Sequence, residues 1–227
     1  MPEIIYGLDI ETDIRTDAAD PAVAAVVRVA LSGRRFDEVF EGPEADLFAD
    51  LDDRLAGLAP GVIATWNGST FDLPFIADRA RLLGVDLGLR LCMDDRLTMQ
   101  RALLPGHRSA YRAAWHQHTH VDTFRLYGRP AAAGPWSSLR NIGRVLGLSP
   151  APTTTSTARF EPLSTEAQHA HAASDARLAR VLAERRWSAA HRLIDRVAPI
   201  EVQPVDVAMS RLERQARLDH VRVPAPV

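Results

Sequence analysis

Apolar and polar positions follow two periods along the chain, and these periods divide it into short strands and amphipathic helices. Alternating or continuous apolar runs predict strands at 4–10, 22–32, 35–41, 61–66 and 119–127. Apolar residues three and four apart predict helices at 44–58, 71–83, 137–148 and 165–187, and a further helix is expected at 207–218. Because strands come first and then alternate with helices, the pattern favours an α/β fold with a mixed sheet covered by helices.

Turn residues and a capping signal indicate where these elements end. Thr165-x-x-Gln168 matches a capping box at the start of the longest helix, and 149–157, rich in Pro, Thr and Ser, predicts a loop. Most of 87–135 gives no clear assignment apart from the strand at 119–127. A length of 227 residues suits one large domain, which we place at 1–187, followed by a helical extension at 188–227.

Composition restricts the class of protein without identifying a function. A content of 46% hydrophobic and 25% charged residues is ordinary for a soluble globular protein, and a net charge of -2 means that nucleic-acid binding would require a local basic patch. All 27 basic residues are arginine, which fits a GC-rich coding genome. Cys92 is the only cysteine, and no run suggests a signal peptide or a membrane span. We therefore expect a cytoplasmic protein without a membrane partner.

The first strand carries the first candidate for chemistry. Asp9 and Glu11 are two residues apart, so the period of a strand directs both side chains to the same face. Two adjacent carboxylates repel each other unless a cation lies between them, and divalent cations prefer such oxygen ligands. The pair is therefore a candidate half of a metal site, although a strand end with solvent-facing acids is the ordinary explanation of so short a pattern.

Two later segments supply candidate partners for this pair. Asp72 opens a helix directly after a strand and a turn, which would hold its carboxylate near the end of that strand. His171 and Asp175 are four residues apart in the long helix, so the imidazole and the carboxylate project from one helical face. Each signal alone has a simple structural explanation, but their combination in this order favours a shared site.

These segments resemble the motifs of the DEDD 3′→5′ exonucleases of the ribonuclease H-like superfamily, most closely the branch similar to the proofreading exonuclease of family B DNA polymerases. Asp9-Ile10-Glu11 matches the first motif, and Asn67-Gly68-Ser69-Thr70-Phe71-Asp72-Leu73-Pro74 matches the second. His171 and Asp175 match the third, and His120-Val121-Asp122 resembles a recurrent non-catalytic feature of the branch. The resemblance implies a ribonuclease H-like mixed β-sheet, an antiparallel meander followed by parallel strands, flanked by helices.

The same resemblance implies a metal-dependent 3′→5′ exonuclease that releases nucleoside 5′-monophosphates from single-stranded DNA or RNA 3′ ends or short oligonucleotides. Asp9, Glu11, Asp72 and Asp175 would hold two Mg²⁺ or Mn²⁺ ions, with Asp9 shared by both. The expected substrate-binding residues lie around the first two motifs; they are Thr12, Trp66, Asn67 and Phe71. Of these, the aromatic residues could stack on a terminal base, and Asn67 could bind the terminal nucleotide or cap the turn.

The third motif departs from the family pattern at the position of the general base. Family members with a catalytic Tyr place it four residues before the last Asp, and those with a catalytic His place it five before. Here Ala170 occupies the five-before position, and His171 occupies the position of the Tyr. We expect His171 to be the base because it shares the helical face of Asp175, with His169 as the second candidate.

Three alternatives remain open from the residues alone. His116, His118 and His120 could form a zinc site on one strand face, although Thr123 stands where a metallo-β-lactamase-like motif would have its final His. The chain could also be a catalytically silent exonuclease-like binding module. Finally, it could be a phosphoesterase that acts on short oligonucleotides or small nucleotides.

Overall fold

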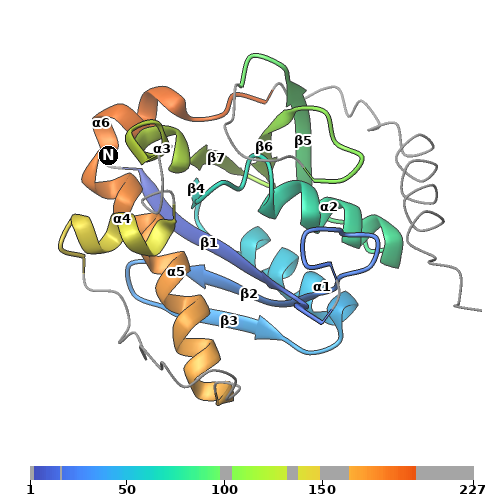
Figure 1. Ribbon diagram of the computed structural model, residues 1–227. Helices are drawn as coiled ribbons and strands as arrows, with labels where there is room; N and C mark the ends of the chain where they lie inside the picture. Colours follow the sequence, from blue (N-terminus) through green and yellow to red (C-terminus); the bar gives the residue numbers. More distant parts are fainter. Residues whose placement is uncertain (1–2, 16, 98–103, 132–137, 149–163, 198–227) are drawn as a thin grey trace, which may run out of the picture.

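A seven-stranded mixed sheet forms the centre of the computed structural model, which describes residues 3–15, 17–97, 104–131, 138–148 and 164–197 (Figure 1). The strand order is β3-β2-β1-β4-β7-β6-β5. In chain order the strands are β1 (Ile4–Thr12), β2 (Val26–Ser32), β3 (Asp37–Glu41), β4 (Gly61–Thr65), β5 (Leu89–Asp94), β6 (Ala110–Trp115) and β7 (His118–Asp122). Strands β1 to β3 pair antiparallel, and β4 pairs parallel with both β1 and β7. The predicted α/β fold, an antiparallel meander followed by parallel strands, is thus confirmed.

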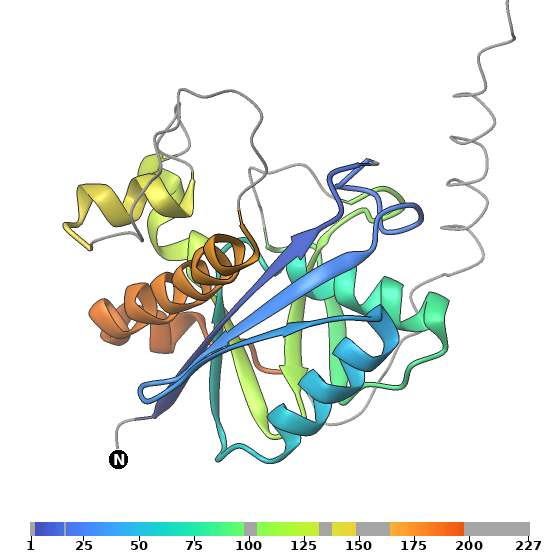
Figure 2. The same ribbon diagram turned by 90° about the horizontal axis from the view of Figure 1, so that it is seen from below.

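Helices cover both faces of this sheet, as the view from below shows (Figure 2). The helices α1 (Glu44–Ala56) and α2 (Asp72–Leu83) lie on one face. On the other face lie α3 (Phe124–Ala131), α4 (Leu139–Val145), α5 (Thr165–Arg185), the short α6 (Trp187–Ala190) and a 3₁₀ helix (His191–Leu193). Among the described residues, no helix is long and apolar enough to span a membrane.

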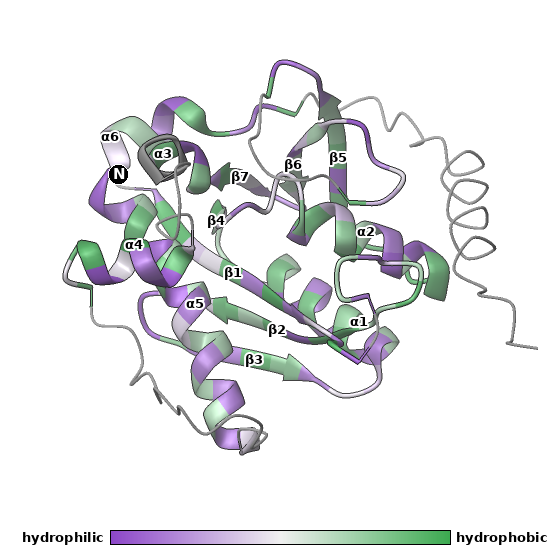
Figure 3. Ribbon diagram, in the orientation of Figure 1, coloured by the Kyte–Doolittle hydropathy of each residue, from purple (hydrophilic) through white to green (hydrophobic). Residues whose placement is uncertain are grey.

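Alternate residues of β1 serve two separate cores. Leu8 and Ile10 pack with the buried leucines of α1 and with Phe75 of α2, whereas Ile5 packs with Val121 and the apolar side of α5. This alternation follows from the two-residue period of a strand whose two faces are both covered. Hydropathy colouring shows that β2 is mainly hydrophobic, while α4 and α5 carry both hydrophobic and hydrophilic residues (Figure 3).

The prediction of a strand at 119–127 is wrong for the second half of that segment. β7 ends at Asp122, and α3 begins at Phe124. The Asp122 carboxylate accepts the backbone N–H of Phe124 at 2.9 Å, which turns the chain out of the sheet and starts the helix. The apolar side chains that resembled a strand are instead the buried side of α3, including Leu126 and Tyr127.

Several predicted boundaries also shift by a few residues. The N-cap of α5 is Ser164, whose hydroxyl accepts the Ala167 N–H, so the capping box predicted at Thr165 is placed one residue too late. β2 begins at Val26 instead of residue 22, because the Asp20 side chain accepts the Ala22 N–H and holds the preceding residues in a turn.

The region around 87–135 contains β5 and β6, which pair antiparallel with each other and join the sheet through β7. The predicted loop at 149–157 and helix at 207–218 lie outside the described residues. Of the predicted extension, residues 188–197 pack against the sheet: Asp195 is fully buried, and its carboxylate lies 2.6 Å from Nδ1 of His120. The division of the chain at residue 187 stays a prediction.

Candidate metal centre

Strand β1 places Asp9 and Glu11 on the face that α5 covers. Gly7, Asp9 and Glu11 lie on this face of the strand, whereas the alternating residues Leu8 and Ile10 are buried against the helices on the opposite face. Asp9 and Glu11 both keep some solvent access, so they line an open edge of the core.

Helix α5 approaches β1 at Gly7. A Cβ atom at Gly7 would lie 1.8 Å from the backbone oxygen of Ala176, a distance at which only a glycine fits. The helix face in contact with the sheet is made of small residues, with Ala172 and Ala176 almost completely buried. Because Asp175 is the neighbour of Ala176, this close packing brings its carboxylate to β1.

The turn before α2 positions the third carboxylate. Asn67 has a φ of 70°, in the left-handed region, and its Oδ1 accepts the Thr70 hydroxyl at 2.8 Å. The fully buried Asp122 carboxylate accepts the N–H groups of Asn67 at 2.8 Å and Ser69 at 3.1 Å. These bonds hold the turn against the end of β7, and Asp72 follows as the first residue of α2, with 4% of its surface exposed.

The four predicted carboxylates interact electrostatically. The pKa of Asp9 is raised well above its ordinary value of 3.8, first by burial and then by the negative charges of Asp72, Asp175 and Glu11. Burial also raises the pKa of Glu11, and Asp175 adds to that effect. Such a concentration of poorly solvated carboxylates favours a bound cation.

His171 joins this cluster, and His169 does not. Ligand atoms of Glu11, His171 and Asp175 all lie within 4.8 Å of one another, so these residues could hold a metal ion. The Nε2 atom of His169 instead lies 2.7 Å from a carboxylate oxygen of Glu41 on β3. The helical spacing of four residues therefore places the His171 side chain beside Asp175.

Arg140 of α4 is a site residue that the sequence did not indicate. Its Nε lies 3.1 Å from both carboxylate oxygens of Asp175, and its Nη2 donates to Oδ2 at 2.5 Å. Its positive charge opposes the carboxylates that raise the pKa of Asp9. No local motif distinguishes Arg140 from the other arginines of this arginine-rich chain, so only the packing of α4 on α5 reveals it.

The predicted substrate-binding residues differ in their exposure to solvent. Thr12 is half-buried, and its hydroxyl donates to the Ala18 carbonyl at 2.9 Å. Trp66 is 8% exposed and packs edge-on against Phe124 in the core, and its Nε1 reaches no acceptor among the described residues. Phe71 is half-buried against Phe75 and is thus the more accessible of the two predicted aromatic residues.

The histidines of the alternative zinc site do not converge. His116 lies in the turn before β7, 3.0 Å from Asp52. His118 is bonded to the Leu55 carbonyl at 2.8 Å, and His120 is bonded to Thr65 at 2.8 Å and to Asp195. Within the described parts of the chain, the only three-ligand group containing a histidine is the one at His171.

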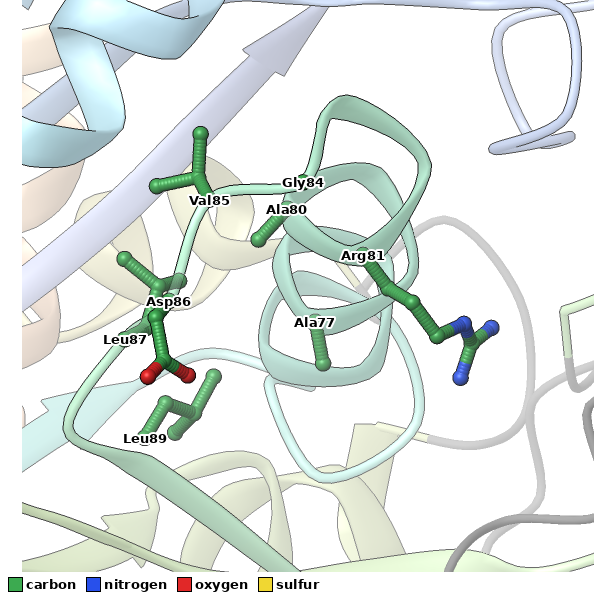
Figure 4. A pocket seen from close by; sticks show the side chains of 8 residues that line it. All are labelled: Ala77, Ala80, Arg81, Gly84, Val85, Asp86, Leu87 and Leu89. Carbon is green, nitrogen blue, oxygen red and sulfur yellow. The ribbon is translucent and has the colours of Figure 1, made fainter.

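A depression of about 400 Å³ lies beside the C-terminal half of α2 (Figure 4). It is lined by Ala77, Ala80, Arg81, Gly84, Val85, Asp86, Leu87 and Leu89. None of the candidate metal ligands lines it, and its walls combine aliphatic side chains with the charged residues Arg81 and Asp86. It is therefore separate from the carboxylate cluster.

Comparison with known proteins supports the fold. No sequence model of a protein family matches the chain, and neither does any curated protein. The chain is similar to a solved structure of the family B DNA polymerase from the hyperthermophilic archaeon Pyrobaculum calidifontis, with a TM-score of 0.59 and 22% sequence identity. The match covers 82% of this chain and 24% of the polymerase chain. At this level of identity the likeness shows the fold alone, which is the α/β, ribonuclease H-like fold predicted from the sequence.

Proposed function

We propose that this protein is a metal-dependent 3′→5′ exonuclease that hydrolyses single-stranded nucleic acid to nucleoside 5′-monophosphates. The observation that carries the proposal is the gathering of carboxylates from β1, α2 and α5: ligand atoms of Glu11, His171 and Asp175 lie within 4.8 Å of one another, and Glu11, Asp72 and Asp175 act on the charge of Asp9. These are the residues that match the three exonuclease motifs in the sequence. The likeness to a family B DNA polymerase supports the same branch at the level of fold.

The donor set fits Mg²⁺ or Mn²⁺. Carboxylate oxygens are the preferred ligands of these ions, and four of them in a partly desolvated cluster leave a negative charge that divalent cations would neutralise. When bound, two such ions would stabilise negative charge on the attacking and leaving oxygens of the phosphodiester. Asp9, Glu11 and Asp175 would hold the first ion, and Asp9 with Asp72 the second.

The protein's own groups would position the substrate and move the proton. His171, beside Glu11 and Asp175, would accept a proton from the attacking water, because a neutral imidazole has one ring nitrogen free to act as a base. Phe71 would stack on the terminal base from the turn that precedes Asp72, with Trp66 supporting that turn from the core. Thr12 and Asn67 would border the terminal nucleotide through the backbone segments that they hold in place.

A product assay tests the proposal. Oligomers of DNA and of RNA, labelled at the 5′ end, are incubated with Mg²⁺ or Mn²⁺ and the wild-type protein, Asp9→Asn or Asp50→Asn. Asp50 is an exposed acid on α1, so its variant controls for the loss of one negative charge. We expect a ladder that shortens from the 3′ end with the wild type and Asp50→Asn, and none with Asp9→Asn.

Other outcomes would point to the alternatives. Intact oligomers together with cleavage of dinucleotides would indicate a phosphoesterase for short substrates. Binding of oligomers without cleavage of any substrate would indicate a silent binding module. Equal activity of wild type and Asp9→Asn would remove the carboxylate cluster from the reaction altogether.

A further inference from the structure

Arg140 donates three hydrogen bonds to Asp175 of the carboxylate cluster, and the proposed reaction gives it no role. Its guanidinium contacts both oxygens of Asp175, at distances from 2.5 to 3.1 Å. Its charge also acts on Glu11 and Asp9. An arginine therefore supplies positive charge at the place where the proposed metal ligands meet.

This ion pair conflicts with full use of Asp175 as a metal ligand. A carboxylate offers about four lone-pair positions on its two oxygens, and Arg140 engages both oxygens. A divalent cation beside the same carboxylate would also repel the guanidinium. Occupancy of the cluster by metal should thus weaken the contact between Arg140 and Asp175.

The position of Arg140 allows its side chain to move away from Asp175. About 35% of its side chain is exposed, compared with 12% for Asp175, and it projects from the short helix α4 on a long, flexible stem. The planar guanidinium matches a phosphate group as well as it matches a carboxylate. Once displaced from Asp175, the Arg140 guanidinium could contact a phosphate group held at the cluster.

We propose that Arg140 is a cation that alternates between two partners: it neutralises Asp175 in the metal-free protein, and it binds the nucleotide phosphate once metal ions occupy the carboxylates. This inference rests on the proposed exonuclease site and adds a substrate-binding residue to it. It predicts effects of opposite sign on the two ligands. Loss of Arg140 should favour the metal and disfavour the nucleotide.

The test measures binding without turnover, using the full-length chain. Calorimetric titrations with Mn²⁺ alone, and then with deoxythymidine or adenosine 5′-monophosphate at saturating Mn²⁺, compare the wild type with Arg140→Gln and Arg140→Lys. Arg144→Gln is the matched control, since Arg144 lies one turn later on α4, is exposed and donates a hydrogen bond to the Asn141 side chain at 3.2 Å. Thermal unfolding with EDTA or Mn²⁺ accompanies each titration.

For Arg140→Gln we expect Mn²⁺ to bind about three- to tenfold more tightly and the nucleotide about tenfold more weakly, with Arg144→Gln unchanged. The affinities of Arg140→Lys for Mn²⁺ and for the nucleotide should lie between those of the wild type and Arg140→Gln, because lysine keeps the charge but lacks the planar guanidinium. The melting temperature of Arg140→Gln should fall in EDTA and recover with Mn²⁺. Weaker binding of both ligands would show a merely structural residue and overturn the proposal, as would unchanged binding of both. If Mn²⁺ does not bind the wild type at all, the proposed metal site itself fails.

Discussion

Replacing Gly7 with alanine tests how the fold assembles the site. Gly7 lies on β1 two residues before Asp9, at the point where α5 packs on the sheet. The added Cβ would meet the Ala176 backbone oxygen at 1.8 Å, and contacts below 3.0 Å are essentially never seen. Because the obstacle is backbone, no side-chain rotation can relieve it, so the helix or the strand must move.

The size of this movement follows from the two distances. Opening the contact from 1.8 Å to 3.0 Å requires a shift of about 1.2 Å, and Asp175 adjoins the residue that must shift. Overpacking of this kind costs roughly 1–3 kcal/mol. The lower chain entropy of alanine in the unfolded state returns about 0.4–1 kcal/mol, so we expect a net loss of about 1 kcal/mol in the free energy of unfolding. A misplacement of about 1 Å at an active site can reduce the rate by roughly 10²-fold.

Urea unfolding in EDTA, Mn²⁺ calorimetry and the oligomer assay measure these effects. The matched control is Gly57→Ala at the C-terminal end of α1, where the new Cβ meets its nearest neighbour at an ordinary 3.5 Å and φ is -83°. This variant gains the same entropic benefit without the clash, so it should be slightly more stable than wild type and fully active. If Gly7→Ala equalled Gly57→Ala in stability and Mn²⁺ affinity, the close approach of α5 to β1 would not be what positions Asp175.

Three further predictions concern the site and its support. Asp122→Asn should lose about 2–3 kcal/mol in the free energy of unfolding, because an amide cannot accept all three backbone N–H groups that the buried carboxylate holds. Urea titration measures this loss, and a value below about 0.5 kcal/mol would contradict the prediction. In EDTA, the stability of the wild type relative to Asp9→Asn should fall as the pH rises above 3.8 and through the raised pKa of Asp9, because the folded carboxyl keeps its proton after the unfolded one has lost it. The difference in melting temperature between about pH 4 and about pH 8 measures this effect, and a constant difference would count against it. His171→Ala should lower the single-turnover rate by roughly 10²–10⁴ while Mn²⁺ still binds. His169→Ala removes a contact with Glu41, and its rate should stay near that of the wild type. Equal losses of rate in the two variants would exclude His171 as the base.

Local periodicity predicted the parts of the site that lie within one element. The two-residue period of β1 places Asp9 and Glu11 on one face, and the spacing of four in α5 places His171 with Asp175. Both relations depend only on backbone geometry over a few residues. Most strands and helices were predictable for the same reason. β5 and β6 lie in a region that gave no clear assignment, and the apolar residues at 124–127 fitted two periods and were assigned to the wrong one.

The tertiary structure alone decided which elements meet. Arg140 and Asp175 are 35 residues apart, and Asp122 lies 55 residues from Asn67, so neither contact leaves a periodic trace in the sequence. The approach of α5 to β1 likewise depends on the absence of a side chain at Gly7, which no local pattern connects with Ala176. The sequence by itself determined which carboxylates share a strand or helix face. Long-range packing decided that these faces meet, which turn is held by a buried carboxylate, and which arginine lies against the cluster, because each depends on close contact between surfaces that are distant along the chain.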